Sequence, residues 1–451
     1  MILNSKTLKT NIVVFMLLAV MLTACSKSIE RAPVAAVQES PIVENTASGF
    51  INRLNETGLG LVREVPASNL KHTSEDVFIG KEEVGMNIAD LRWLDCKTEL
   101  TEDEQKRISE YYPHMYFTYN TIFPDTMPAD FDPEEVLEVS RNPGLGVRSL
   151  HSDGINGSGV GVAIIDQVLY TGHPEYSEQL ALYEEIHVMP NEGASMHGSA
   201  VASIAVGKSC GVAPGAKLYY WAVNLYKDTI SKSKTDENLA FAEGLAVAID
   251  RVLEVNKTLP DNEKIRVISI SRGFRNLEDE GVKTFLAAVE RAKEAGIFVI
   301  TTSTFQYYDW LSKDTDFAGL GKVDYTGDPD ELSTYTLGAW EQIEADKYTS
   351  MLLVPMDART TADFTEDGGY VFYSDGGWSW VAPYVAGVYA LACQAKPDIT
   401  PEEFYKAAIS TSDVLTVKIQ TETGGTGDAG TEYTLQHVIN PAKLIASLSK
   451  G

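Results

Sequence analysis

Residues 161–166 read Gly-Val-Ala-Ile-Ile-Asp, a short apolar run that ends on a carboxylate. The run Val160–Ile165 predicts a buried β-strand. Runs of the same kind return at residues 218–223, 266–271 and 297–300. Between the runs, small or apolar residues are spaced as in packed helices, at 197–206, 239–253 and 286–292.

This alternation of strand and helix decides the fold class. It predicts an α/β fold of three layers, with a parallel sheet and helices on both faces. In such sheets the functional groups gather at the carboxyl ends of the strands. Asp166 stands at such an end. The pattern becomes regular only from about residue 141, so we expect residues 141–451 to form the main domain.

Three residues of the main domain are candidates for serine hydrolysis: Asp166, His197 and Ser379. The reaction needs a hydroxyl that loses its proton, an imidazole that accepts it and a carboxylate that orients the imidazole. Taken singly, each residue has an ordinary alternative, namely a turn aspartate, a helix-capping histidine and an N-cap serine. Together they predict a hydrolytic site.

The sequence around the histidine and the serine favours two closely packed helices. Gly198 and the small residues after it let a helix approach the sheet. Gly376 and Gly377 allow a tight entry to a second helix, and Pro383 fits an early turn of it. Ser379 would then lie near the positive end of a helix dipole and near free backbone N–H groups.

At these three positions the sequence resembles the subtilase family, in the order of the residues and in their separations. The resemblance covers about residues 145–445 and does not include the N-terminal part. The motifs are Val162-Ala163-Ile164-Ile165-Asp166 with His173-Pro174-Glu175, then Met196-His197-Gly198-Ser199-Ala200-Val201-Ala202 with Gly211-Val212-Ala213-Pro214-Gly215-Ala216-Lys217-Leu218, and Gly377-Trp378-Ser379-Trp380-Val381-Ala382-Pro383-Tyr384-Val385-Ala386-Gly387.

The resemblance implies a subtilisin-like fold and a serine endopeptidase that works through an acyl-enzyme. Ser379 would be the nucleophile, His197 the general base and acid, and Asp166 the residue that orients His197. The stretch Ile268–Gly273 would bind an extended peptide substrate by β-addition, with Ser271, Arg272 and Gly273 as substrate-binding residues.

One departure from the family's pattern concerns the oxyanion. The family usually has an asparagine after the strand equivalent to 297–300, whereas this chain has Thr301-Thr302-Ser303-Thr304-Phe305-Gln306. Loss of one such donor costs about 10²–10³ in rate, a value measured on subtilisin itself. Thr304 and Gln306 are the candidate substitutes. Trp378 and Trp380 also stand where the family has Thr and Met.

No metal or other cofactor is expected, because the sequence has neither Cys-x-x-Cys nor His-Glu-x-x-His. Glu175 matches a position that ligates calcium in some relatives, which leaves calcium open, although an ordinary surface carboxylate is the simpler interpretation. The short loop 207–210 lacks the calcium-binding insertion of many relatives.

Two rival functions remain. A pseudopeptidase would keep the fold and bind peptides or proteins with little or no catalysis. An α/β-hydrolase would use Gly377-Trp378-Ser379 as a nucleophile elbow with His437, but that elbow needs a second glycine where Val381 stands. The second rival would also leave Asp166 and His197 without a role.

The N-terminus predicts export and a lipid anchor. Lys6 and Lys9 precede an apolar run at 12–22, too short to span a bilayer but suited to a signal peptide. The run leads into Leu22-Thr23-Ala24-Cys25, which resembles a bacterial lipobox. We therefore expect a signal peptide at 1–24, lipidation of Cys25, and a mature protein on the extracellular or periplasmic side of the cell membrane.

The segments between the anchor and the main domain are less regular. Residues 25–50 are rich in Ser, Pro, Val, Ala and Glu and predict a flexible tether. Residues 51–140 form an N-terminal extension of unknown fold, with a helix expected at 100–111 that is capped by Thr101 and Glu104. The formal net charge of −27 argues against a nucleic-acid partner.

Overall fold

A computed structural model describes the chain at residues 42–44, 50–56, 58–69, 78–81, 87–92, 94, 100–111, 114–224, 236–274, 277, 280–339, 341–366, 368–419 and 430–449. All of these belong to one compact unit. The predicted signal peptide, Cys25 and Cys96 lie outside the described residues. Within the described residues, no helix has the length and apolar character that crossing a membrane requires.

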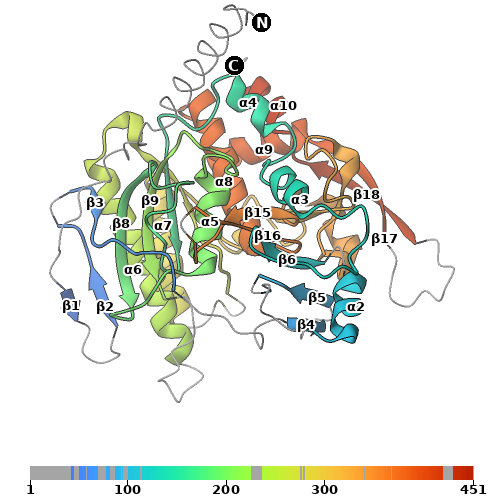
Figure 1. Ribbon diagram of the computed structural model, residues 1–451. Coiled ribbons are helices and arrows are strands. Elements are labelled where there is room, and N and C mark those ends of the chain that lie inside the picture. The colour runs from blue at the N-terminus through green and yellow to red at the C-terminus, as the bar shows by residue number, and fades with distance from the viewer. Residues whose placement is uncertain are drawn as a thin grey trace, which may run out of the picture. The chain divides into compact units, whose positions relative to one another are not determined.

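The largest sheet confirms the predicted α/β fold (Figure 1). Strands β8, β9, β7, β10 and β11 run parallel in that order, which is the predicted parallel core. β2 adds to β8 in the antiparallel sense, and β1 pairs with β2. The strands of this sheet are β1 (Ile42–Glu44), β2 (Ile51–Arg53), β3 (Gly60–Leu61), β7 (Gly161–Asp166), β8 (Leu180–Val188), β9 (Lys217–Val223), β10 (Ile265–Ser269) and β11 (Phe298–Ile300).

Helices cover the sheet on both faces, since every residue of β7 is buried. α5 packs on α8, and α6 packs on α7. Both α5 and α8 also contact β7, so the predicted histidine and serine helices lie against the strand that ends at Asp166. The helices of the described residues are α2 (Glu102–Tyr111), α3 (Pro133–Val139), α4 (Val147–Ser152), α5 (Met196–Val206), α6 (Asp236–Thr258), α7 (Glu280–Glu294), α8 (Trp378–Ala395), α9 (Pro401–Thr411) and α10 (Pro441–Leu448).

Two smaller sheets complete the described fold, and the sequence patterns did not predict them. One has the order β13-β12-β14-β18-β17, and the other has the order β15-β16-β6-β5-β4. The second joins the N-terminal extension to the main domain, because β6 pairs with β16. The strands are β4 (Phe78–Lys81), β5 (Asn87–Asp90), β6 (Met115–Thr118), β12 (Phe317–Lys322), β13 (Tyr335–Leu337), β14 (Leu352–Pro355), β15 (Arg359–Ala362), β16 (Tyr370–Tyr373), β17 (Asp413–Ile419) and β18 (Thr431–Val438).

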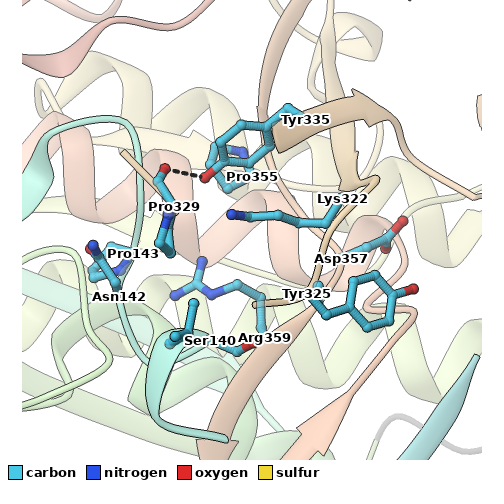
Figure 2. A pocket seen from close by; sticks show the side chains of 12 residues that line it. Ser140, Asn142, Pro143, Lys322, Tyr325, Pro329, Tyr335, Pro355, Asp357 and Arg359 are labelled. Carbon is cyan, nitrogen blue, oxygen red and sulfur yellow. Dashed lines mark hydrogen bonds between the residues drawn. The ribbon is translucent and has the colours of Figure 1, made fainter. Parts of the chain in front are cut away.

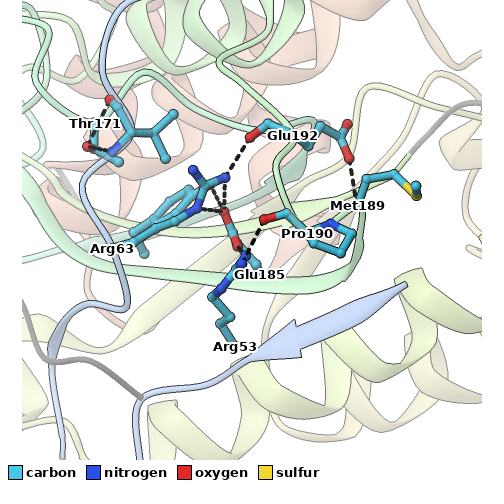
Figure 3. A network of polar contacts seen from close by, with 9 residues as sticks. Arg53, Arg63, Thr171, Glu185, Met189, Pro190 and Glu192 are labelled. Atoms are coloured by element: carbon cyan, nitrogen blue, oxygen red, sulfur yellow. Dashed lines mark hydrogen bonds and ion pairs between the residues drawn. The ribbon is translucent and has the colours of Figure 1, made fainter. Parts of the chain in front are cut away.

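Two buried glutamates of β8 hold the start of the extension against the main sheet, and Figure 3 shows one of them, Glu185. Glu185 accepts from Arg53 and, at 2.6 Å, from Nε of Arg63. Glu184 accepts from the backbone N–H of Asn55 at 2.7 Å and from Arg251 at 2.9 Å. Both glutamates are fully buried, so loss of the arginines would leave a buried charge without its partner. Residues 50–63 are therefore an integral part of this unit.

Most of the predicted elements are confirmed, with two corrections. The helix expected at 100–111 is α2, and Thr101 and Glu104 exchange the predicted capping bonds at 2.8 and 3.3 Å. The expected tether at 25–50 contains strand β1, whose Ile42 and Val43 are β-branched and favour a strand. The strand expected at 266–271 ends at Ser269, although Ile270 still donates its backbone N–H to the carbonyl oxygen of Ile300 at 2.9 Å.

Gly198 is the residue that lets α5 approach the sheet. A Cβ at Gly198 would lie 2.6 Å from Oη of Tyr220 and 2.7 Å from the carbonyl oxygen of Gln167. We predict that Gly198→Ala lowers the free energy of unfolding by about 1–3 kcal/mol through overpacking, measured by urea denaturation. The matched control is Gly193→Ala, where a Cβ meets nothing within 4 Å. Equal stability of the two variants would show that α5 is not held by this close approach.

Candidate active site

Asp166 is placed by the sheet. It is the last residue of β7 and is fully buried. Its Oδ1 accepts from the backbone N–H of Gln167 at 2.8 Å and from Nδ1 of His197 at 2.6 Å. A buried carboxylate bonded to Nδ1 fixes the tautomer in which Nε2 of the imidazole is free to accept a proton.

His197 lies in the first turn of α5, as predicted. The N-cap Ser195 accepts from its backbone N–H at 3.1 Å, which sets the start of the helix. Burial lowers the pKa of His197, but the charge and the hydrogen bond of Asp166 outweigh burial, and the net pKa lies above the ordinary value. The Arg272 guanidinium acts weakly in the other direction. The side chain is 19% exposed, so one edge of the ring faces the surface.

Ser379 is held by a glycine turn at the start of α8. Gly377 has φ 67°, in the left-handed region that glycine adopts without strain. A Cβ at Gly376 would lie 2.4 Å from the carbonyl oxygen of Met356. Ser379 follows as the second residue of the helix, half-buried, and its backbone N–H has no acceptor among the described residues. The predicted tight entry is therefore present.

The serine and the histidine border the same segment of chain. Ser271 Oγ donates to the carbonyl oxygen of Ser379 at 2.6 Å, and Ser379 Oγ donates to the carbonyl oxygen of Ser271 at 3.4 Å. The next residue, Arg272, is close enough to act on the charge of His197. Within the described chain no hydrogen bond joins His197 to Ser379. Catalytic hydrogen bonds are often long in the absence of substrate and tighten when substrate binds.

The two oxyanion candidates from the sequence have other partners. Thr304 is fully buried and donates its hydroxyl to the carbonyl oxygen of Thr301 at 3.0 Å. The prediction of Thr304 as an oxyanion donor is therefore wrong, because its hydroxyl is bonded within its own buried turn and cannot face a substrate. Gln306 donates Nε2 to the carbonyl oxygen of Phe274 at 2.7 Å, which uses one of its two N–H groups.

Two other hydroxyl groups lie beside the candidate substrate segment. A Cβ at Gly273 would lie 2.6 Å from Oγ1 of Thr302 and 2.9 Å from Oγ of Ser303. Neither hydroxyl has a hydrogen-bond partner among the described residues. Sequence reasoning could have found these two residues, because they belong to a run of hydroxyl residues directly after β11, at the carboxyl edge of the sheet.

The segment 271–273 has backbone groups available for an extended chain. The carbonyl oxygen of Arg272 is already used within the protein, since it accepts from the backbone N–H of Thr302 at 3.2 Å. The backbone N–H and carbonyl of Gly273 have no partner among the described residues. The substrate-binding role expected for Ile268–Gly273 is wrong in its first part, because Ile268 and Ser269 pair with β7 and β11 on both sides and Ile270 donates its backbone N–H to Ile300. Ser271, Arg272 and Gly273 lie beyond these pairings.

Buried carboxyl groups support the loops around Ser379, and sequence reasoning missed them. Glu341 accepts from Nε1 of Trp378 at 2.8 Å, and burial raises the pKa of Glu341 to about 7. Asp316 accepts from the backbone N–H of Phe305 at 3.2 Å, and burial raises its pKa to about 7. Asp357 accepts from the backbone N–H of Gly376 at 2.9 Å. Asp357 and Glu341 therefore hold the turn that precedes Ser379, while Asp316 holds the turn at residues 304–306.

Glu175 is a buried structural residue, not the surface carboxylate that the sequence suggested. It accepts from Ser209 Oγ at 2.6 Å and from Tyr370 Oη at 2.5 Å. Burial raises the pKa of Glu175, but these hydrogen bonds outweigh burial and the net pKa lies below the ordinary value. Among the described residues, no three His, Cys, Asp or Glu side chains are grouped as metal ligands.

The structure also gives partners to the other residues that the sequence singled out. His437 shares a hydrogen bond with Ser412 Oγ at 3.1 Å, so its ring has a place outside the serine site. Trp380 is buried against Tyr373, with ring centroids 5.1 Å apart in an edge-to-face arrangement, while Trp378 is 46% exposed.

A buried carboxylate bonded to a histidine, at the carboxyl edge of a parallel sheet, is one part of the arrangement found in α/β serine hydrolases. Residues 157–304 match the subtilase family. This range contains Asp166 and His197 and ends before Ser379.

Two curated relatives are subtilases. The chain is 22% identical over 281 residues to the subtilisin-like protease PopC of Myxococcus xanthus, covering 57% of this chain and 56% of that protein. It is 27% identical over 230 residues to a protein named as a probable subtilase-type serine protease of Deinococcus radiodurans, covering 48% of this chain and 28% of that protein. The chain thus spans about half of the first relative's length and about a quarter of the second's.

Two solved structures that are similar to this chain carry the names of proteases. The prenylagaramide maturation protease PagA is 19% identical, covers 67% of this chain and 98% of its own, and has a TM-score of 0.42. The serine protease MycP1, named as a component of a type VII secretion system, is 19% identical, covers 72% of this chain and 91% of its own, and has a TM-score of 0.43.

The charge of Asp166 should control the protonation of His197. We predict that Asp166→Asn lowers the pKa of the His197 ring below its ordinary value of 6.5, because burial and Arg272 then act without opposition. An NMR titration of the ring measures this, with His197→Ala to assign the signal. Asp153→Asn is the control, since that residue is an exposed aspartate at the end of α4. An unchanged pKa in Asp166→Asn would contradict the pairing.

Proposed function

We propose that this chain is a serine endopeptidase in which Asp166, His197 and Ser379 form the catalytic triad. The observation that carries the proposal is the 2.6 Å bond between Asp166 and His197, beside the segment that holds Ser379. The subtilase-family match supports the same activity. The substrate would be a peptide or a protein segment, and no nucleic acid is expected.

The reaction begins with a rotation of the Ser379 hydroxyl. In the structure Ser379 Oγ donates to the carbonyl oxygen of Ser271, so it has to turn towards Nε2 of His197. His197 then takes the hydroxyl proton while Oγ attacks the peptide carbonyl carbon, and the negative charge moves to the carbonyl oxygen. Collapse of this intermediate breaks the C–N bond, and His197 returns the proton to the leaving amine. Water, activated by His197, releases the acyl group in the same way.

The oxyanion would be stabilised by the free backbone N–H of Ser379 at the start of α8. The hydroxyl groups of Thr302 and Ser303 are the second donors that we propose, in place of the family's asparagine. A hydroxyl on a short side chain is a less fixed donor than an amide. We therefore expect a slower enzyme than a subtilase that has the asparagine.

The substrate would lie along 271–273 and pair with the free backbone groups of Gly273. Trp378 stands directly before the nucleophile with nearly half of its ring exposed, and its N–H is bonded to the buried Glu341. A ring held in this way would be an apolar wall next to the scissile bond. We propose that it favours a large apolar substrate residue there.

The competing function is a peptide-binding module without catalysis. One observation favours it, namely that Ser379 Oγ is bonded to the carbonyl oxygen of Ser271 and not to His197. Both functions use the same surface, so a measurement of nucleophilicity is needed to separate them.

A fluorophosphonate probe, which reacts only with an activated serine, tests the proposed activity. We predict that wild type is labelled, that Ser379→Ala is not, and that His197→Ala is labelled about 10²–10⁴ times more slowly. Ser410→Ala, an exposed serine of α9, is the matched control and should label like wild type. Absence of labelling in folded wild type would support the binding module.

We also propose that the mature protein is held at the cell membrane by a lipid on Cys25, as the lipobox resemblance predicts. Expression in a bacterial host should place wild type in the membrane fraction, and Cys25→Ser should move it to the soluble fraction. Cys96→Ser is the control for loss of a cysteine and should remain with the membranes. Membrane retention of Cys25→Ser would overturn the anchor.

A further inference from the structure

Arg359, the first residue of β15, is a buried cation without a counter-charge. It is 3% exposed, and its one hydrogen bond runs from Nη2 to the carbonyl oxygen of Cys210 at 3.0 Å. Its Nε and Nη1 have no acceptor, and no carboxylate lies within ion-pair distance, in the part of the chain that the structure describes. A buried charge of this kind is costly unless something neutralises it.

A second cation lies at the same place. Lys322, at the end of β12, is mostly buried and donates Nζ to Thr334 Oγ1 at 3.1 Å. Its ammonium lies 4.5 Å from the ring centroid of Tyr335. Burial lowers the pKa of Lys322 to about 8, although nearby Asp328, Asp324 and Asp330 partly oppose this. Lys322 also forms no ion pair among the described residues.

Arg359 and Lys322 line one small cavity (Figure 2). In this view the guanidinium and the ammonium point towards the same space beside Pro329. The cavity has a volume of about 10 Å³, counted as the space open to the centre of a water molecule. A space of this size holds about one water-sized particle, which excludes phosphate and sulfate.

The acidic residue that lines the cavity does not neutralise the two cations. Asp357 points away from them in Figure 2. Its two oxygens accept from the backbone N–H groups of Ala339 at 2.8 Å and Gly376 at 2.9 Å. Burial and the neighbouring Asp375 raise the pKa of Asp357 well above its usual range. The lining of the cavity thus contains two cations and one carboxyl group that faces elsewhere, while Asp324, Asp328 and Asp330 lie near Lys322 without forming an ion pair with it among the described residues.

We propose that this cavity binds a single halide ion, such as chloride, between Arg359 and Lys322. The ion accepts hydrogen bonds from Nε and Nη1 of the guanidinium and neutralises the buried charge. It ties together the segments 139–143, 322–335 and 355–359, which line the cavity. A water molecule fits the same space and satisfies the same donors, but it leaves the charge uncompensated.

Thermal unfolding of the purified protein tests the site in solution. At constant ionic strength, replacement of sodium gluconate by sodium chloride should raise the Tm of wild type by roughly 2–4 °C at chloride well above its Kd. Arg359→Met and Lys322→Met should lose this response. Arg291→Met, an exposed arginine paired with Asp250, is the matched control and should keep it.

A diffraction measurement on wild type keeps the proposal testable even if a variant fails to fold. Crystals grown in sodium bromide should show an anomalous peak between the Arg359 guanidinium and the Lys322 ammonium. Water density there without an anomalous peak would overturn the proposal. A chloride response in Arg359→Met equal to that of wild type would overturn it as well.

Discussion

The contact between the loop after β7 and the first turn of α5 is the constraint on which the site depends. Asp166 can reach Nδ1 of His197 only because the first turn of α5 lies in direct contact with residues 166–168. Gly198 makes this possible, since a side chain there would meet the Gln167 carbonyl and Tyr220. Ser195 adds a second link, because its backbone N–H donates to the carbonyl oxygen of Val168 at 2.8 Å. This packing places the Asp166 carboxylate beside the His197 ring, and the carboxylate raises the pKa of His197.

The serine side of the site is organised differently. Two buried carboxyl groups hold the turn before Ser379. Asp357 accepts a hydrogen bond from the backbone N–H of Gly376, and Glu341 accepts one from Nε1 of Trp378. Burial raises the pKa of both carboxyl groups. Buried carboxyl groups are costly, but each satisfies an N–H group that the glycine turn or the indole would otherwise leave unpaired. The same region contains the buried cations Arg359 and Lys322. Polar groups in the interior thus fix the loops that the parallel sheet alone would leave free.

Local patterns were sufficient to predict the parallel sheet, the helices α5 and α8 and the carboxyl-edge position of Asp166. Those features follow from apolar periodicity and from glycines, which act over a few residues. The two smaller sheets could not be predicted, because β6 pairs with β16 about 250 residues later in the chain. Thr304 was a wrong oxyanion candidate for a related reason, since only coordinates show that its hydroxyl closes a buried turn. The roles of Arg53 and Arg63 depend on Glu185, which no spacing rule connects to them.

The most direct test of the triad is a crystal structure of the protein after reaction with diisopropyl fluorophosphate. The account predicts phosphorus bonded to Ser379 Oγ, the bond to the Ser271 carbonyl broken, and Nε2 of His197 turned towards the adduct within about 3.2 Å of an oxygen on it. An unmodified Ser379 that still donates to Ser271, with His197 directed elsewhere, would contradict the claim that these three residues act together.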